Sequence, residues 1–176
     1  MGEKNGETES YLYQGVSLNA GSYRLTFDFL GSLSDQGQIP DLFMASLFFA
    51  NNPPFDPINS IGITGSAPLF DLDWAGETLY ANLSNASIVP SSKGGGWRQF
   101  GGVFSVQQGY AIPTFELLNL SFLDVSSVNV TNVNIGAVAV DEPGTFWLMG
   151  MGILVAAGSR RLGSRRQPNH IRSCIL

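Results

Sequence analysis

Two aspartates and a glycine in the stretch DLDWAGETLYAN have the spacing of a calcium-binding loop. Asp71, Asp73 and Gly76 stand at positions 1, 3 and 6 of that loop, and Ca²⁺ prefers oxygen ligands such as carboxylates. Ala75 occupies position 5 and Asn82 occupies position 12, where a bidentate Glu is required. The complete template therefore fails, and two interpretations remain open. The two aspartates and loop carbonyls could hold a structural calcium ion, or they form a solvated strand end. No other cofactor is predicted.

Carboxylates are also the main general acids and bases available to residues 1–138. The single His and the single Cys, His170 and Cys174, lie in the last seven residues, so the earlier part has no imidazole base and no thiol nucleophile. Two carboxylates can cleave a glycosidic bond when they lie about 5–9.5 Å apart. A chain of this size leaves little room for a deep cleft, so we expect no enzymatic activity and keep glycan cleavage as an alternative. The candidate pairs are Asp71 with Glu116 and Asp73 with Glu77.

Aromatic side chains suggest a different kind of site. A flat ring packs against the apolar face of a pyranose while neighbouring polar groups bond its hydroxyls. Trp74, Tyr80 and Tyr110 are therefore candidates for a carbohydrate-binding platform. Trp97 follows three glycines and is expected in the core. The alternative for all four rings is ordinary packing, since large rings in a small domain are usually buried in its core.

Alternating hydrophobicity predicts the strands that would position these residues. In YRLTFDFL every second residue from Tyr23 to Phe29 is apolar, so these side chains share one face of a strand. The 21 glycines and the scarcity of Lys and Glu disfavour long surface helices. Turn-rich segments separate further predicted strands at 11–16, 42–50, 69–73, 78–83, 86–89, 97–106, 114–124 and 127–138.

These strands predict an all-β domain at residues 1–138. Short strands without a convincing helix describe a two-sheet β-sandwich, and we expect a jelly-roll topology. The apolar positions of VNVTNVNIGAV shift by one, which predicts a bulge near Thr131 and Asn132. The longest irregular segments are expected at 35–40 and 51–68, and loops at the end of a rigid sandwich often carry binding residues.

Charge is divided unevenly along the chain. Residues 1–142 contain 4 basic and all 14 acidic side chains, whereas residues 143–176 contain five arginines and no acid. An acidic domain repels phosphates, so we expect no nucleic acid partner. A basic cluster beside an apolar run is typical of the cytoplasmic flank of a membrane segment.

That apolar run covers residues 144–159, which carry no charge. As a helix it would span about 24 Å, against a hydrocarbon core of about 30 Å. Arginine side chains can reach the interface and the bilayer can thin, so we expect a short C-terminal transmembrane helix that contacts membrane lipid. The alternative is a buried core helix of the domain.

The order of these features resembles a known sorting signal. Val140, Glu142 and Pro143 precede the apolar helix, and the pairs Arg160–Arg161 and Arg165–Arg166 follow it. This arrangement is similar to the PEP-CTERM signal of Gram-negative bacteria that make exopolysaccharide. The resemblance implies export, an intermediate held in the inner membrane, and cleavage near the Glu-Pro motif by an exosortase, the expected protein partner.

Two features depart from the family pattern. Asp141 stands where the family usually has Pro, and residues 167–176, expected to be disordered, extend beyond the usual end. The signal itself covers residues 139–166. The first residues, MGEKNGETESYLYQGV, contain no apolar stretch, so a secretory signal is not expected in this numbering.

A second resemblance concerns the body of the chain. VSLNAGSYRLTFDF, GGWRQFGGVFSV and SSVNVTNVNIGAV are similar in rhythm to galactose-binding-like jelly rolls. This resemblance implies the fold and contact with carbohydrate, such as exopolysaccharide. The leading hypothesis is thus a non-enzymatic protein of the cell surface or extracellular matrix. A small glycan-cleaving enzyme and a permanently membrane-anchored adhesin are the alternatives.

Overall fold

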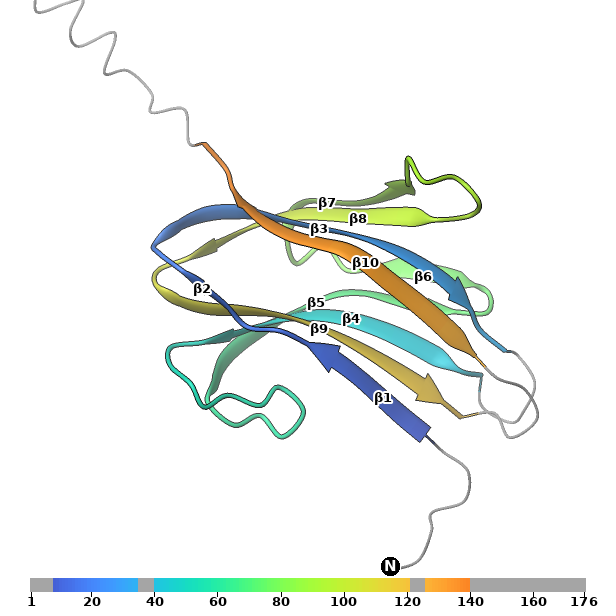
Figure 1. The fold of residues 1–176 in the computed structure, drawn as a ribbon, viewed down its shortest axis with the longest axis horizontal. Coiled ribbons are helices and arrows are strands. Elements are labelled where there is room, and N and C mark those ends of the chain that lie inside the picture. Colours follow the sequence, from blue (N-terminus) through green and yellow to red (C-terminus); the bar gives the residue numbers. More distant parts are fainter. Residues whose placement is uncertain (1–7, 35–39, 121–125, 140–176) are drawn as a thin grey trace, which may run out of the picture. The chain divides into compact units, whose positions relative to one another are not determined.

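The computed structural model describes residues 8–34, 40–120 and 126–139. Within these residues the protein is all-β, with ten strands in two antiparallel sheets and no helix, as the alternation predicted (Figure 1). The strands are β1 (Thr8–Tyr13), β2 (Val16–Leu18), β3 (Gly21–Ser32), β4 (Leu42–Ala50), β5 (Ile63–Asp73), β6 (Gly76–Leu79), β7 (Ser84–Pro90), β8 (Arg98–Val106), β9 (Gly109–Asn119) and β10 (Ser127–Ala137).

The two sheets form the layers of a sandwich. Sheet A has the order β1-β9-β4-β5-β6, and β2 also pairs with β9, whereas sheet B has the order β10-β3-β8-β7. The chain crosses between the sheets after β2, β3, β6, β8 and β9, so each sheet is built from segments that are distant in sequence. Figure 1 shows the two layers stacked face to face.

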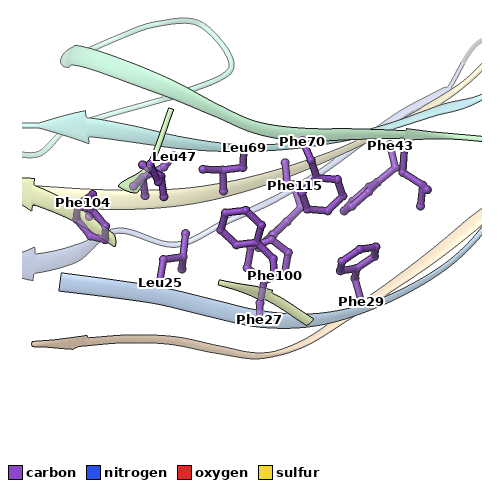
Figure 2. Close-up of a cluster of buried hydrophobic side chains, with 14 residues drawn as sticks. Leu25, Phe27, Phe29, Phe43, Leu47, Leu69, Phe70, Phe100, Phe104 and Phe115 are labelled. Atoms are coloured by element: carbon purple, nitrogen blue, oxygen red, sulfur yellow. The ribbon is translucent and has the colours of Figure 1, made fainter. Parts of the chain in front are cut away.

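Phenylalanine rings fill the space between the sheets. Phe27 of β3 is fully buried and lies 5.1 Å from Phe100 of the same sheet. It also lies 4.8 Å from Phe115 and 6.0 Å from Phe70, both of sheet A. Such ring pairs stabilise a core beyond the area that they bury. Figure 2 shows these rings between the layers, so the predicted inward face of the YRLTFDFL strand is confirmed.

The predicted bulge in β10 is confirmed as well. Its register with β3 shifts between Thr131 and Asn134, and Asn132 has a φ of 53°. Asn tolerates this left-handed conformation better than most residues. The bulge therefore occurs where the apolar pattern shifts.

Some strand limits differ from the prediction. β5 begins at Ile63, inside the segment 51–68 that was expected to be irregular, because outward polar residues hide its alternation. β9 begins at Gly109 although Gly and Pro near its start indicated a turn. A Cβ at Gly109 would lie 2.5 Å from the carbonyl oxygen of Ala50, so the close approach of β4 requires glycine here. Pro113 has no N–H to donate, and it lies where the pairing of β9 passes from β1 to β2.

The loop of residues 51–62 folds back over sheet A. Figure 1 shows it on the side of sheet A that faces away from sheet B, which we call the outer face of sheet A. The ring of Phe55 lies 5.2 Å from that of Tyr110, and a Cβ at Gly15 would lie only 2.2 Å from the Phe55 ring. Pro57 is buried. The loop is therefore packed onto the sheet.

The C-terminal predictions concern residues that lie outside the described part of the chain. These are the motif Val140, Glu142 and Pro143, the apolar segment 144–159 and the arginines that follow it. In the described segments, no helix is long and apolar enough to cross a membrane.

Candidate functional site

Strand register brings four chemically distinct side chains into one row on the outer face of sheet A. Tyr11 of β1 pairs with Glu116 of β9, Glu116 pairs with Met44 of β4, and Met44 pairs with Asp71 of β5. Residues directly opposite in an antiparallel sheet share a face. Phe43, Phe70 and Phe115, the sequence neighbours of this row, are buried in the core, so the row itself faces outward.

A groove of about 210 Å³ lies over part of this row. Its floor comes from outward side chains of β4 and β9, and its walls come from β1 and from the loop of residues 51–62. The groove is lined by Tyr11, Met44, Phe48, Pro57, Ile58 and Glu116, together with the hydroxyl side chains of β4 and β9. We call this site the sheet A groove. It combines apolar and aromatic surface with a carboxylate and hydroxyls.

The loop wall of the groove is held by its own hydrogen bonds. The Asp56 carboxylate accepts the backbone N–H of Ile58 at 2.9 Å and the side-chain amide of Asn59 at 2.7 Å. The pKa of Asp56 lies below its usual value, mainly because of the hydrogen bond from the Asn59 amide. Asp56 and Ile61 also form an isolated bridge. Ile58 is thus positioned beside the sheet while its side chain stays 44% exposed.

A phenol between two carboxylates forms the polar edge of the groove. The Tyr11 hydroxyl donates to Oε2 of Glu9 at 2.8 Å. The bond to Glu9 is the largest cause that raises the pKa of Tyr11 well above its ordinary value, followed by burial and by Glu116. Tyr11 therefore stays a neutral donor at physiological pH, and its hydroxyl can donate a hydrogen bond to only one carboxylate at a time.

The structure does not bring the three predicted platform rings together. Trp74 lies in the β5–β6 turn and is 56% exposed, whereas Tyr110 stands opposite Ala50 at the other end of β4 and packs against Phe55. The two ends of β4, Leu42 and Ala50, are eight residue steps apart, which is about 27 Å. Tyr80 is half-buried and donates to Oδ2 of Asp71 at 2.6 Å.

The aspartates of the calcium hypothesis have protein partners. Oδ1 of Asp73 accepts the backbone N–H groups of Ala75 at 2.8 Å and Gly76 at 2.9 Å, which closes the β5–β6 turn. Asp71 accepts the Tyr80 hydroxyl. Among the residues that the structure describes, no group of three or more His, Cys, Asp or Glu side chains is arranged to hold a metal ion.

The two candidate carboxylate pairs differ in geometry. Asp71 and Glu116 lie on either side of Met44 on one face, about 10 Å apart at the backbone because two strand spacings separate them. Glu77 instead stands opposite the buried Leu72 and forms an ion pair with Arg98 of sheet B. Asp73 follows Leu72 and so points to the other face. The structure therefore separates Asp73 from Glu77.

A buried carboxylate on sheet B has a structural role. Asp28 is 3% exposed and accepts hydrogen bonds from Ser91 at 2.9 Å, Gln99 at 3.2 Å and Asn132 at 2.7 Å. These donors tie the β7–β8 loop and the β10 bulge to β3. In the same loop Lys93 lies 4.3 Å from the ring centroid of Trp97. Trp97 was expected in the core, but the structure leaves it half-buried.

The residues of the sheet A groove were largely missed by sequence reasoning. Glu116 was named only as half of a catalytic pair, while Phe48 and Ile58 were not named. One available signal was the stretch LFMASLFFA, which is apolar on both faces of β4. A strand of that kind is covered on both sides.

Comparisons with known proteins give no assignment. The chain matches no protein-family model, no curated protein and no solved structure.

The Asp28 network predicts a stability that depends on pH. Burial raises the pKa of Asp28, but the bonds from Asn132, Ser91 and Gln99 outweigh it and hold the pKa below the ordinary 3.8. A carboxyl whose pKa is lower in the folded state than in the unfolded state stabilises the fold at pH values above the unfolded-state pKa. This stabilisation is lost as the pH falls through the folded-state pKa. Urea denaturation should therefore show a large stability gap between the wild type and Asp28→Ala at pH 7 that narrows below about pH 3.8.

Phe27→Leu provides the control because it removes no titratable group. Its stability gap to the wild type should stay constant over the same pH range. A gap for Asp28→Ala that is constant or widens with acid would contradict the role given to the carboxylate.

Proposed function

We propose that the protein is an exported, non-enzymatic component of the cell surface or of an exopolysaccharide matrix, and that it binds polysaccharide in the sheet A groove. The observation that carries the proposal is the groove itself, where aromatic and aliphatic walls meet hydroxyls and a carboxylate. We further propose that the sandwich has the jelly-roll topology of galactose-binding-like domains.

The chemistry of a sugar ring supports this choice of ligand. A pyranose presents an apolar face of C–H groups and a rim of hydroxyls, so it needs stacking surface and hydrogen-bonding groups together. Tyr11, Phe48 and Ile58 supply the surface, and Glu116 and Thr114 supply polar groups beside it. The volume lies below the roughly 300–1,000 Å³ of sites that enclose a small molecule, which suits contact with one ring of a longer polymer.

A preformed wall also favours binding. Phe55 and Pro57 anchor the loop of residues 51–62 to the sheet, and Asp56 fixes its turn. A ligand that meets an ordered wall loses less free energy to the ordering of the protein on binding.

We propose that the C-terminal residues direct the protein to its location. Val140, Glu142 and Pro143 would be presented to an exosortase while residues 144–159 lie in the inner membrane. Arg160 and Arg161, with Arg165 and Arg166, would stay on the cytoplasmic side, as the distribution of positive charge in membrane proteins favours.

Glycan cleavage is a second candidate, favoured by one observation. Asp71 and Glu116 share the outer face of sheet A on either side of Met44. Their side chains could approach the separation used by inverting glycosidases, about 6.5–9.5 Å. Asp71 already accepts the Tyr80 hydroxyl, however, and the groove is lined by Glu116 but not by Asp71, so binding is the better supported function.

Binding is tested with the full chain on a glycan array, followed by titration with the glycan that binds best. Tyr11→Ala should weaken binding about tenfold or more, because it removes one ring of stacking surface from the groove. Trp74→Ala is the matched control, since it removes an exposed ring outside the groove, and its affinity should stay within about twofold. Weaker binding in Trp74→Ala but not in Tyr11→Ala would place the site at the β5–β6 turn instead. The absence of any bound glycan would overturn the proposal.

Cleavage is tested by measuring released reducing ends from the same glycan. We expect none above a blank without protein. Release that disappears in both Asp71→Asn and Glu116→Gln, while binding persists, would establish the enzymatic alternative.

Sorting is tested by fractionating cells with and without the exosortase. We expect a processed form outside the cytoplasm in the first strain and an uncleaved, membrane-held form in the second. Mass spectrometry of the mature protein should find a C-terminus near Glu142. An intact Arg-rich C-terminus in both strains would support permanent anchoring instead.

A further inference from the structure

Charge is segregated between the two sheets of the sandwich. The basic side chains of the described residues are Arg24, Lys93 and Arg98, and all belong to strands of sheet B or to the β7–β8 loop. The outer face of sheet A carries acidic residues from three strands and no Lys or Arg in its described part. These acids are Glu9, Asp71, Asp73 and Glu116.

Among the residues that the structure describes, the acids nearest the groove form no ion pair with a basic side chain. Glu9 and Glu116 both lie beside the Tyr11 hydroxyl, which donates its one hydrogen bond to Glu9 in the structure. Like charges on neighbouring strands destabilise a sheet, and a site lined by one sign of charge concentrates ligands of the opposite sign. The groove therefore favours a cationic ligand and disfavours polysaccharides that carry carboxylates or sulfates.

The form of the cation follows from the geometry. A divalent metal needs several oxygen ligands from one cluster, and the described residues offer no group of three or more suitable side chains. An ammonium group needs only one or two carboxylates, and it gains further from the face of an aromatic ring such as Tyr11. The apolar walls formed by Phe48 and Ile58 favour an ammonium group attached to a body with an apolar face.

We propose that the polysaccharide bound in the sheet A groove is a hexosamine polymer with free amino groups, whose ammonium groups pair with Glu116 and Glu9. This proposal rests on the proposed function and specifies its ligand. The sugar ring stacks on Tyr11 and Phe48, and the charged amine at its edge lies toward the two carboxylates.

The test compares oligosaccharides of equal length by titration calorimetry of the full chain. The probes are a β-1,4-linked glucosamine hexamer, its fully N-acetylated counterpart and a neutral glucose hexamer. We expect the amine to bind about tenfold or more tightly than the N-acetylated form, because a charge-assisted hydrogen bond is replaced by a neutral one. The preference should decrease at high salt.

Variants locate the effect in the groove. Glu116→Gln should remove the preference, so that this variant binds the amine and the N-acetylated hexamer with affinities within about twofold of each other. Glu9→Gln serves as an independent second variant with the same expected direction. Asp73→Asn is the matched control, because it removes the same charge outside the groove while its side-chain oxygen can still close the β5–β6 turn. Thermal melts check that each variant is folded.

Each outcome has a separate meaning. Equal affinity for the amine and N-acetylated hexamers overturns this inference and leaves glycan binding intact. Preference for the amine that survives in both Glu116→Gln and Glu9→Gln, or that is lost equally in Asp73→Asn, indicates attraction by the overall negative charge and also overturns it. Failure of every glycan to bind overturns the proposed function itself.

Discussion

The packing of phenylalanine rings between the two sheets determines which side of each strand faces outward. Phe27 of sheet B meets Phe70 and Phe115 of sheet A, and all three are buried. Side chains alternate along a strand, so a slip of one residue would exchange the two faces and remove these rings from the core. With the rings fixed, Glu116 and Met44 must lie on the outer face. The surface that we propose for binding is therefore a consequence of the core.

Much of the fold could be predicted from the sequence because it follows from local alternation. The inward face of β3 and the bulge at Asn132 are both visible as patterns of a few residues. The groove could not be predicted in the same way, because its walls depend on contacts between distant segments. Phe55 packs against Tyr110 and Gly15, and no local pattern indicates either contact. The residues 140–176, on which the prediction of location depends, are not described by the structure.

Carboxylates have several distinct roles here that residue type alone does not separate. Asp28 is buried and satisfied by three side-chain donors, so it fixes the position of a loop and a bulge. Asp56 and Asp73 shape turns through backbone N–H groups. Glu77 pairs with Arg98, whereas Glu116 faces a groove without a basic neighbour in the described residues. Only the three-dimensional surroundings distinguish an acid that holds the protein together from one that can meet a ligand.

The contact between Gly15 and Phe55 links the groove to a position that no ligand would touch. Any side chain at Gly15 would displace the Phe55 ring, which packs the loop that carries Pro57 and Ile58 against the sheet. The shape of the sheet A groove therefore depends in part on Gly15, a residue that does not line it. A larger side chain at position 15 would therefore change which ligands fit the proposed site, with every group in the groove left as it is.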